Sequence, residues 1–238
     1  NNFVQELELD GSGGIWIGTG SGLAYVDKDN NWKVYTKKDG LILDSIDAIE
    51  PDGKGGIWFG YYPDTKGEGE NAQYIGAYQH LDKDGKLTTY NGFDSKNFNI
   101  NWIRSASMDK EGGVWIVRSG NAPGFSLGEI DYIKDGQRTV YTTKDLVPNL
   151  DENDDIRFLT VDKSNGLLYI GTKAGGVLIS DKVGNIIGKI NSENGLPNNK
   201  WNNVYFLDIE NGNLFIGTNG GAAIGQLLLP SLGGINEK

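Results

Sequence analysis

One short pattern occurs five times in this chain of 238 residues and restricts the folds that it can adopt. Each copy joins a turn rich in Asp, Asn and Gly to an apolar run with an aromatic residue at an equivalent position. The five aromatic residues are Trp16, Trp58, Trp115, Tyr169 and Phe215. They recur at intervals of 42, 57, 54 and 46 residues. Such spacing is typical of repeat arrays, solenoids and propellers, because one unit alone cannot bury its apolar face.

Each unit divides into short apolar runs separated by turn residues, which in the first unit are 4–9, 15–19, 23–26 and 32–36. Short runs joined by tight turns are typical of an antiparallel meander. Repeated meanders predict an all-β protein, a β-propeller of four-stranded antiparallel blades in a single domain over residues 1–238. The expected blades span about 1–36, 45–90, 102–142, 155–191 and 203–230.

The fifth unit is irregular, because residues 222–226 run on to Pro230 without a turn or a clear fourth strand. Five loosely closed blades are favoured, and a larger propeller to which this chain contributes is the alternative. The chain begins at Asn1 rather than Met, so we interpret it as a mature or excised piece. The lack of a signal peptide therefore gives no information on compartment.

Composition excludes several classes of partner and site. The net charge of −10 argues against nucleic acid or anionic lipid as the main partner. No run of about 18 apolar residues is present, so no membrane insertion is expected. The absence of cysteine excludes disulfides and thiolate metal sites. The aromatic residues that the repeats share, such as Trp58, are expected in the packing between blades, because a repeated residue at a repeated position packs a repeated interface.

The repeat resembles a known family. The run from Asp10 to Thr19, with a following Gly-Leu strand, resembles the two-component regulator propeller repeat, and so do the connecting segments at Gly40-Leu41 and 194–197. The resemblance covers nearly the whole chain. It implies an extracytoplasmic propeller, often the sensor portion of bacterial hybrid histidine kinases that respond to polysaccharide fragments. This chain departs from that pattern in having five repeats and no kinase or transmembrane part.

Function in a repeat protein is expected where equivalent positions differ. The first strand of each blade should line the central channel, and the residue after its first Val or Ile is always polar and varies between the blades. These residues are Gln5, Asp47, Arg104, Arg157 and Tyr205. Two interpretations stay open. These residues could form an asymmetric ligand site at the channel mouth, or they could form an internal network in which Asp47 pairs with the arginines.

Arginines and long loops point to the same face of the propeller. Only four of the 22 basic residues are arginines, and Arg118 is expected near the mouth with Arg104 and Arg157. Guanidinium groups suit a carboxylate or sulfate, which favours an acidic ligand. The loops between the second and third strands are longest in the second and third units. Aromatic residues expected on this face are Tyr61, Tyr62, Trp102 and Trp201, which could stack on sugar rings or, for the two tryptophans, plug the channel.

Catalytic motifs are scarce. His80 is the only histidine and lies in a strand pattern, so a two-histidine metal site and a Ser-His-Asp triad are not expected. The segment 18–22 resembles a nucleotide loop but leads into a strand rather than a helix. A carboxylate pair could combine Asp47 with one of the rim residues Asp44, Asp154 or Asp155.

The leading hypothesis is therefore a non-enzymatic, extracytoplasmic sensor-type propeller. It binds either an oligosaccharide, with acidic sugars among the candidates, or a protein on its long-loop face. No cofactor or metal is predicted, and the oligomeric state is not predicted. One alternative is a five-bladed glycoside hydrolase or lyase that uses channel carboxylates. Another is a pure scaffold, in which the chain's own side chains fill the channel.

Overall fold

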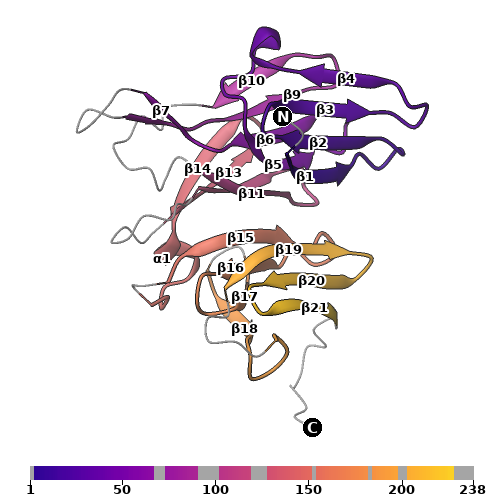
Figure 1. Ribbon diagram of the computed structural model, residues 1–238. Coiled ribbons are helices and arrows are strands. Elements are labelled where there is room, and N and C mark those ends of the chain that lie inside the picture. Colours follow the sequence, from indigo (N-terminus) through magenta and orange to yellow (C-terminus); the bar gives the residue numbers. More distant parts are fainter. Residues whose placement is uncertain are drawn as a thin grey trace.

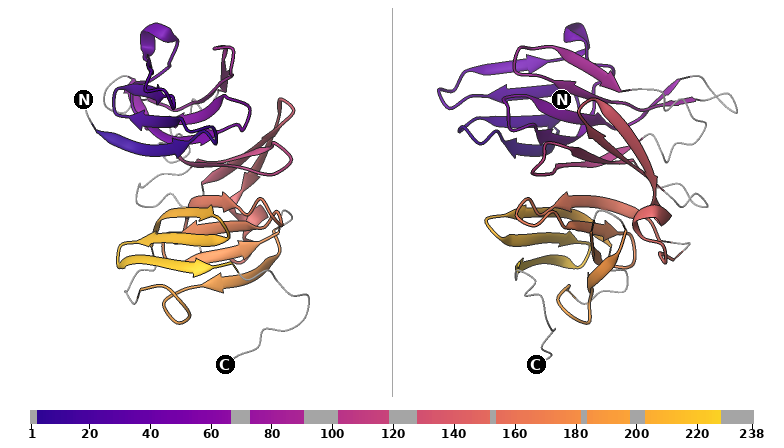
Figure 2. Two further views of the ribbon diagram at one scale, coloured as in Figure 1. Left: turned by 90° about the vertical axis from the view of Figure 1, so that its right-hand side faces the viewer. Right: turned by 180° about the vertical axis from the view of Figure 1, so that it is seen from behind.

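A computed structural model describes residues 3–66, 73–90, 102–118, 128–151, 154–181, 184–197 and 203–227. The protein is all-β, and five antiparallel blades stand around a central channel, which confirms the predicted propeller (Figure 1). The first three blades form the upper part of the molecule in Figure 1, and the last two form the lower part. Figure 2 shows the same succession from the side and from behind.

The first blade consists of β1 (Val4–Leu9), β2 (Ile15–Thr19), β3 (Gly22–Val26) and β4 (Trp32–Tyr35). The second consists of β5 (Ile46–Pro51), β6 (Ile57–Tyr61), β9 (Tyr78–Leu81) and β10 (Leu87–Tyr90). The third consists of β11 (Ile103–Met108), β12 (Val114–Arg118), β13 (Glu129–Lys134) and β14 (Gln137–Thr142). The fourth consists of β15 (Ile156–Val161), β16 (Leu168–Thr172), β17 (Val177–Ser180) and β18 (Ile186–Ile190). The fifth consists, within the described residues, of β19 (Val204–Glu210), β20 (Asn213–Thr218) and β21 (Gly221–Gln226).

Three small elements complete the described chain. The long loop of the second blade contains a hairpin of β7 (Asp64–Lys66) and β8 (Gln73–Ile75), which projects to the left in Figure 1. The short helices η1 (Lys37–Asp39) and α1 (Thr143–Leu146) follow the fourth strands of blades 1 and 3. No helix of the described residues is long and apolar enough to cross a membrane.

In the first three repeats, the turn between the first and second strands is held by its own aspartate. Asp52 Oδ1 accepts hydrogen bonds from the Lys54 and Gly56 amides at 2.7 and 2.8 Å. The other oxygen, Oδ2, lies 2.9 Å from His80 Nε2, and the His80 ring stacks on Trp58 at 4.5 Å. His80 therefore belongs to the packing of the blade, where the sequence places it. Asp10 and Asp109 make the equivalent bonds to their own turns and to a tyrosine of the third strand.

Four apolar cores lie between successive blades. Each core joins the shared aromatic residue of one blade to the first strand of the next, as Trp58 joins Ile103 and Met108. The central strands β6, β12 and β16 are buried along their whole length, because a neighbouring blade covers each face. The first strands pack in succession from β1 through β5, β11 and β15 to β19. Among the described residues, no comparable packing joins β19 back to β1.

Candidate functional site

The five first strands enclose a channel cavity of about 660 Å³. They run in the same direction along this channel, so equivalent residues lie at the same depth. The variable position is the second residue of each strand and stands at one end of the channel. Residues three positions later stand about 10 Å further along, since a strand rises about 3.3 Å per residue. The channel therefore has two ends with separate chemistry.

Trp102 connects the second and third blades at the first end. Its Nε1 donates a 2.6 Å hydrogen bond to Asp47 Oδ2. The Arg104 guanidinium lies over the Trp102 ring, with Cζ 3.5 Å from the ring centroid, which is a cation–π contact. The Tyr62 ring meets Trp102 edge to face at 4.9 Å. These four residues form one layered cluster around a single indole ring.

Arg157 and Asp155 extend this cluster onto the fourth blade. Arg157 Nε lies 3.8 Å from Asp155 Oδ2, and both side chains are buried. The other oxygen of Asp155 accepts a 3.2 Å hydrogen bond from the Gly128 amide. We use the term channel mouth for the group formed by Asp47, Tyr62, Trp102, Arg104, Asp155 and Arg157.

Burial shifts the pKa values of the charged residues in the channel mouth. It raises the pKa of the Asp47 carboxyl, against the opposing effects of the Trp102 hydrogen bond and the Arg104 charge. It also raises the pKa of Asp155, which the Gly128 amide and both guanidinium groups oppose. Burial, together with repulsion from Arg157, lowers the pKa of Arg104 to about 10. The structure thus holds two carboxylates and two guanidinium groups in a poorly solvated place.

Several buried polar atoms of the channel mouth have no hydrogen-bond partner among the described residues. They are Arg104 Nε, Arg104 Nη2, Arg157 Nε and Asp47 Oδ1. Buried polar groups in native proteins are nearly always hydrogen-bonded, so each exception calls for an explanation. Here three donors and one acceptor occur within one cluster.

The remaining variable residues are more exposed. Tyr205 has half of its surface exposed, and its hydroxyl accepts a 3.1 Å hydrogen bond from Asn203 Nδ2. Gln5 is exposed on β1. Trp201 lies outside the described residues, as does the long loop of the third blade. The structure therefore groups three of the five variable residues by direct contact or charge, namely Asp47, Arg104 and Arg157.

Arg118 lies apart from the channel mouth, against the prediction. Its side chain is fully buried in blade 3, where Nε donates to Asp131 Oδ2 at 3.1 Å and Nη2 pairs with Glu129. Asp131 also accepts from Arg138 Nε at 2.9 Å and from the Tyr78 hydroxyl at 2.9 Å. Because Tyr78 belongs to blade 2, this network fixes one blade to the next. The sequence signal for it was Asp131, a carboxylate in an otherwise apolar strand.

Tyr61 is also placed differently from the prediction. It is fully buried at the end of β6, and its hydroxyl donates to Gln79 Oε1 and accepts from the Ile42 amide at 3.2 Å. Burial raises its pKa above the ordinary tyrosine value. Tyr61 therefore serves the interior of blade 2, while its neighbour Tyr62 reaches the channel mouth.

Two of the rim aspartates have structural partners. Asp44 pairs with Lys37 Nζ at 2.8 Å on the surface. Asp154 Oδ1 accepts from the Asp155 and Ala174 amides, each at 2.8 Å. Asp155 is thus the rim carboxylate that the structure brings to the channel mouth.

The second end of the channel is acidic, which the sequence analysis missed. We call this group the acidic end, and it consists of Glu6, Glu8, Glu50, Asp208 and Lys163. Burial raises the pKa of Glu8 to about 8 and that of Glu50 to about 7, and neighbouring carboxylates add to both shifts. Lys163 Nζ lies 3.4 Å from Glu50 Oε1 and opposes them. The signal in the sequence was the second polar position of the same strands, three residues after the variable one.

Two of these glutamates also hold the backbone of the neighbouring blade. Glu6 Oε2 accepts from the Ile49 amide at 2.6 Å, and Glu50 Oε1 accepts from the Met108 amide at 3.0 Å. Ser105 and Ser107 make the corresponding bonds to the fourth blade, each at 3.1 Å. The channel lining therefore satisfies amides at the inner edges of the blades.

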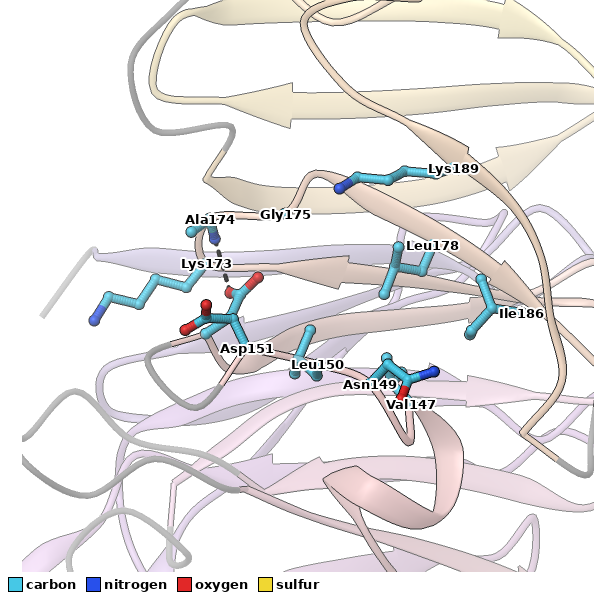
Figure 3. Close-up of a pocket in the computed structure, with 11 residues that line it drawn as sticks. Val147, Asn149, Leu150, Asp151, Lys173, Ala174, Gly175, Leu178, Ile186 and Lys189 are labelled. Carbon is cyan, nitrogen blue, oxygen red and sulfur yellow. Dashed lines mark hydrogen bonds between the residues drawn. The ribbon is translucent and has the colours of Figure 1, made fainter.

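A separate cavity of about 750 Å³ lies beside blade 4, away from the channel (Figure 3). Its apolar wall consists of Val147, Leu150, Leu178 and Ile186. Lys173 and Lys189 stand at its edge, and Asp154 closes one side through its bond to the Ala174 amide. Asp154, one of the candidate rim carboxylates, lines this cavity, and the other predicted site residues do not.

No protein-family model matches the sequence, and no curated protein resembles it significantly. Solved structures share the fold. PorZ, an essential bacterial surface component of the type-IX secretion system of Porphyromonas gingivalis, superimposes with a TM-score of 0.55 at 19% identity over 94% of this chain. The chain spans 32% of PorZ.

Two further structures have lower sequence identity. A gluconolactonase of Xanthomonas campestris gives a TM-score of 0.63 at 14% identity, over 93% of this chain and 71% of its own. A calcium-binding protein, regucalcin from Agrobacterium tumefaciens, gives 0.50 at 12% identity, over 93% of this chain and 88% of its own. At these identities the comparisons establish a β-propeller fold.

Proposed function

We propose that the chain is a non-enzymatic binding module that holds an oligosaccharide at the channel mouth. The observation that carries this proposal is the set of buried, unpartnered atoms on Arg104, Arg157 and Asp47. Leaving such atoms unpaired costs about 1–3 kcal/mol each. A ligand that pairs with them recovers part of that free energy on binding.

The mixture of donors and acceptors favours a sugar over a simple anion. Guanidinium nitrogens only donate, and a carboxylate oxygen only accepts. A sulfate could pair with Arg104 and Arg157 but has no proton to donate to Asp47. A sugar hydroxyl can accept from an arginine and donate to Asp47, so one polyhydroxylated ligand meets the whole set.

The aromatic cluster supports the same ligand class. Tyr62 is exposed and lies against Trp102, whose ring Arg104 also contacts. The apolar C–H face of a pyranose ring can stack on Tyr62, while its hydroxyls reach the charged groups behind. Trp102 thereby acts as a rigid support for the residues that meet the ligand.

The charge of the ligand is a separate part of the proposal. The predicted preference for an acidic sugar relied on three arginines against one aspartate. With Arg118 buried elsewhere and Asp155 beside Arg157, the two arginines face two carboxylates. We therefore propose that neutral and acidic sugars bind with comparable affinity, within about threefold, rather than with strong selection for the acid.

Hydrolysis is the second candidate function, and one observation favours it. Burial raises the pKa of both Asp47 and Asp155, as it does for the general acid of a glycosidase. Each carboxylate also lies near a guanidinium group, which favours the ionised form and opposes a role as acid. Incubation of bound oligosaccharides with the protein and analysis of the products separates binding from cleavage.

The proposal includes an extracytoplasmic location and a sensor-type role for the propeller. It is supported by the resemblance of the repeats to the two-component regulator propeller and by the fold shared with PorZ, a surface component. Fractionation of the native host cells, followed by immunodetection, tests it. Recovery of the protein in the cytoplasmic fraction alone would contradict it.

The direct test is calorimetric titration with matched pairs of neutral and uronic-acid oligosaccharides. We expect at least one pair to bind, and Arg104→Gln to weaken that binding at least tenfold. Lys83→Gln is the matched control, because Lys83 carries the same charge on the surface turn between β9 and β10 and pairs with the exposed Asp84. Equal binding by Arg104→Gln and the parent would refute the site, and cleavage of the sugar would favour the hydrolase.

A further inference from the structure

Three of the four packed junctions between blades use one repeated fit, in which the Ile or Val that begins a first strand sits over a glycine in the second strand of the preceding blade. The junction between blades 3 and 4 has Val117 in the place of that glycine. A Cβ atom added to Gly60 would lie 2.1 Å from Ile103 Cγ2. The same construction at Gly171 would meet Val204 Cγ1 at 2.6 Å. Each glycine thus forms a hollow that the next blade fills.

Both halves of this fit are unused between blade 5 and blade 1. Gly217 of blade 5 is the equivalent of Gly60, yet the atoms nearest to it belong to Phe206 of its own blade. Val4 of blade 1 is the equivalent of Ile103. Val4 is 50% exposed, whereas Ile103 is completely buried. The hollow and the residue that would fill it are both present and do not meet.

The rest of these two faces is exposed in the same way. On blade 1, Leu7 and Leu9 are 58% and 63% exposed, whereas Ile49, the equivalent of Leu7 in blade 2, is 1% exposed. On blade 5, Phe206 is 45% exposed, and Ile224 of the last described strand is 70% exposed. Such a concentration of apolar side chains on two facing flanks marks an interface that lacks its partner.

The backbone contacts between first strands stop at the same place. In blades 2 and 3, Glu50 and Ser107 accept hydrogen bonds from amides of the following blade. Asp208 is their equivalent in blade 5. It accepts instead from the amide of Ile209, its own neighbour, at 2.7 Å. Side-chain packing and hydrogen bonding therefore both identify an unfilled junction.

We infer that the flanks of blades 5 and 1 receive one further antiparallel blade of the same repeat. This blade begins its first strand with Ile or Val, to fill the hollow at Gly217, and carries a glycine in its second strand, to receive Val4. The two exposed faces are the two halves of the junction that the chain already uses, which identifies the partner as a blade. A second copy of the chain offers the same faces, and the oligomeric state of the parent chain distinguishes it from a single added blade.

The test is an extended chain in which a second copy of blade 4, residues 155–197, follows residue 238 through a flexible linker. This blade carries Ile156 and Gly171 at the two required positions. We expect amide hydrogen exchange in β1 and β21 to slow at least tenfold and the melting temperature to rise. The matched control is the same extension with Ile156→Asp in the added copy, which should leave exchange unchanged. Equal exchange in the parent, the extension and the control would overturn the inference.

A second measurement on the parent chain keeps the inference testable if the extension does not fold. Leu9→Gln and Ile224→Gln should leave the melting temperature unchanged and reduce the binding of an apolar fluorescent dye, because both side chains face water. Sedimentation velocity of the parent should show a monomer. An oligomer that either substitution dissociates would overturn the inference in favour of a second copy.

Discussion

The packed junction between blades 2 and 3 and the channel mouth contain adjacent residues of β11, but the two positions are constrained differently. Ile103 fills the hollow at Gly60 and is shared in kind by every repeat. Arg104, the next residue, stands at a position that varies between the repeats and carries a buried charge with two unpartnered nitrogens. The register of β11 against β12 shifts between Ile103 and Ser105, so Arg104 lies outside the regular ladder and its side chain leaves the junction that Ile103 packs. Packing therefore constrains one position and leaves the next available for a ligand.

The two tryptophans at these places should differ most in their contribution to stability. Trp58 lies in the packed junction against Tyr78, His80 and Tyr90. Trp58→Ala should lower the free energy of unfolding by about 3–5 kcal/mol, as large-to-small changes in a core do. Trp102→Ala at the channel mouth should lower it by less than half as much. Urea denaturation of both variants measures the difference.

The fold of each variant is checked by circular dichroism before the comparison. Equal losses at the two tryptophans would mean that Trp102 is core and that the channel mouth is packing rather than a site. A larger loss at Trp102 would point to the same conclusion.

Two equivalent glycines sharpen the comparison between a filled and an unfilled junction. Gly60→Ala forces a methyl group onto Ile103 and should destabilise the protein by about 1–3 kcal/mol, as overpacking does. Gly217→Ala meets only Phe206 Cβ at 3.1 Å, which a small shift relieves, so the loss should stay below about 1 kcal/mol. Thermal melts of the two variants give the result. Comparable losses would show that a structured neighbour already covers Gly217.

The acidic end predicts that the stability of the protein falls as the pH rises. The folded state raises the pKa of Glu50 to about 7 from an ordinary value near 4.5. The folded state therefore binds this proton more tightly, and its stabilising effect, complete below pH 4.5, is lost as the pH rises through 7. Between pH 5 and 8 the free energy of unfolding should fall, with Glu50 contributing on the order of 1–2 kcal/mol.

Glu50→Gln should remove that contribution, because the amide oxygen can still accept from the Met108 amide without carrying charge. Glu193→Gln is the control, since Glu193 is exposed and lies outside the channel. Denaturation curves at several pH values compare the two. A Glu50→Gln variant with the parent's pH dependence would assign the effect to other groups, of which Glu6 and Glu8 are the first to examine.

The repeat made the fold predictable from the sequence. Trp58 and Ile103 recur as an aromatic and a β-branched residue in every repeat, and Gly60 recurs in all but the third, because the same kind of junction must be packed several times. The sequence of blade 5 is irregular because it lacks a clear fourth apolar run, and the structure describes three strands there. Whether Gly217 has a partner could not be read from the sequence, because the local pattern is identical in a filled and an unfilled junction.

The site was predictable only in part. Asp47, Arg104 and Arg157 were found by their variation at an equivalent position. The sequence assigns Arg118 and Tyr61 to the face of the channel mouth because each ends the second strand of its blade. A position at the end of a strand does not indicate which cross-strand partners the side chain has. Hydrogen bonds to Asp131 and Gln79 hold the side chains of Arg118 and Tyr61 inside the blades. A buried polar partner on the neighbouring strand decides the outcome, and such pairs are not periodic.

The smallest effect is expected at Tyr205, the variable residue of blade 5. Its hydroxyl is exposed and has one described bond, from Asn203, so Tyr205→Phe should change the free energy of unfolding by less than about 0.5 kcal/mol. Blade 5 has no described contact with the Arg104 cluster, and the substitution should leave oligosaccharide affinity within about twofold. Calorimetry of this variant beside Arg104→Gln decides how far the site extends. A tenfold loss at Tyr205→Phe would enlarge the channel mouth to the fifth blade and make the ligand one that spans the channel.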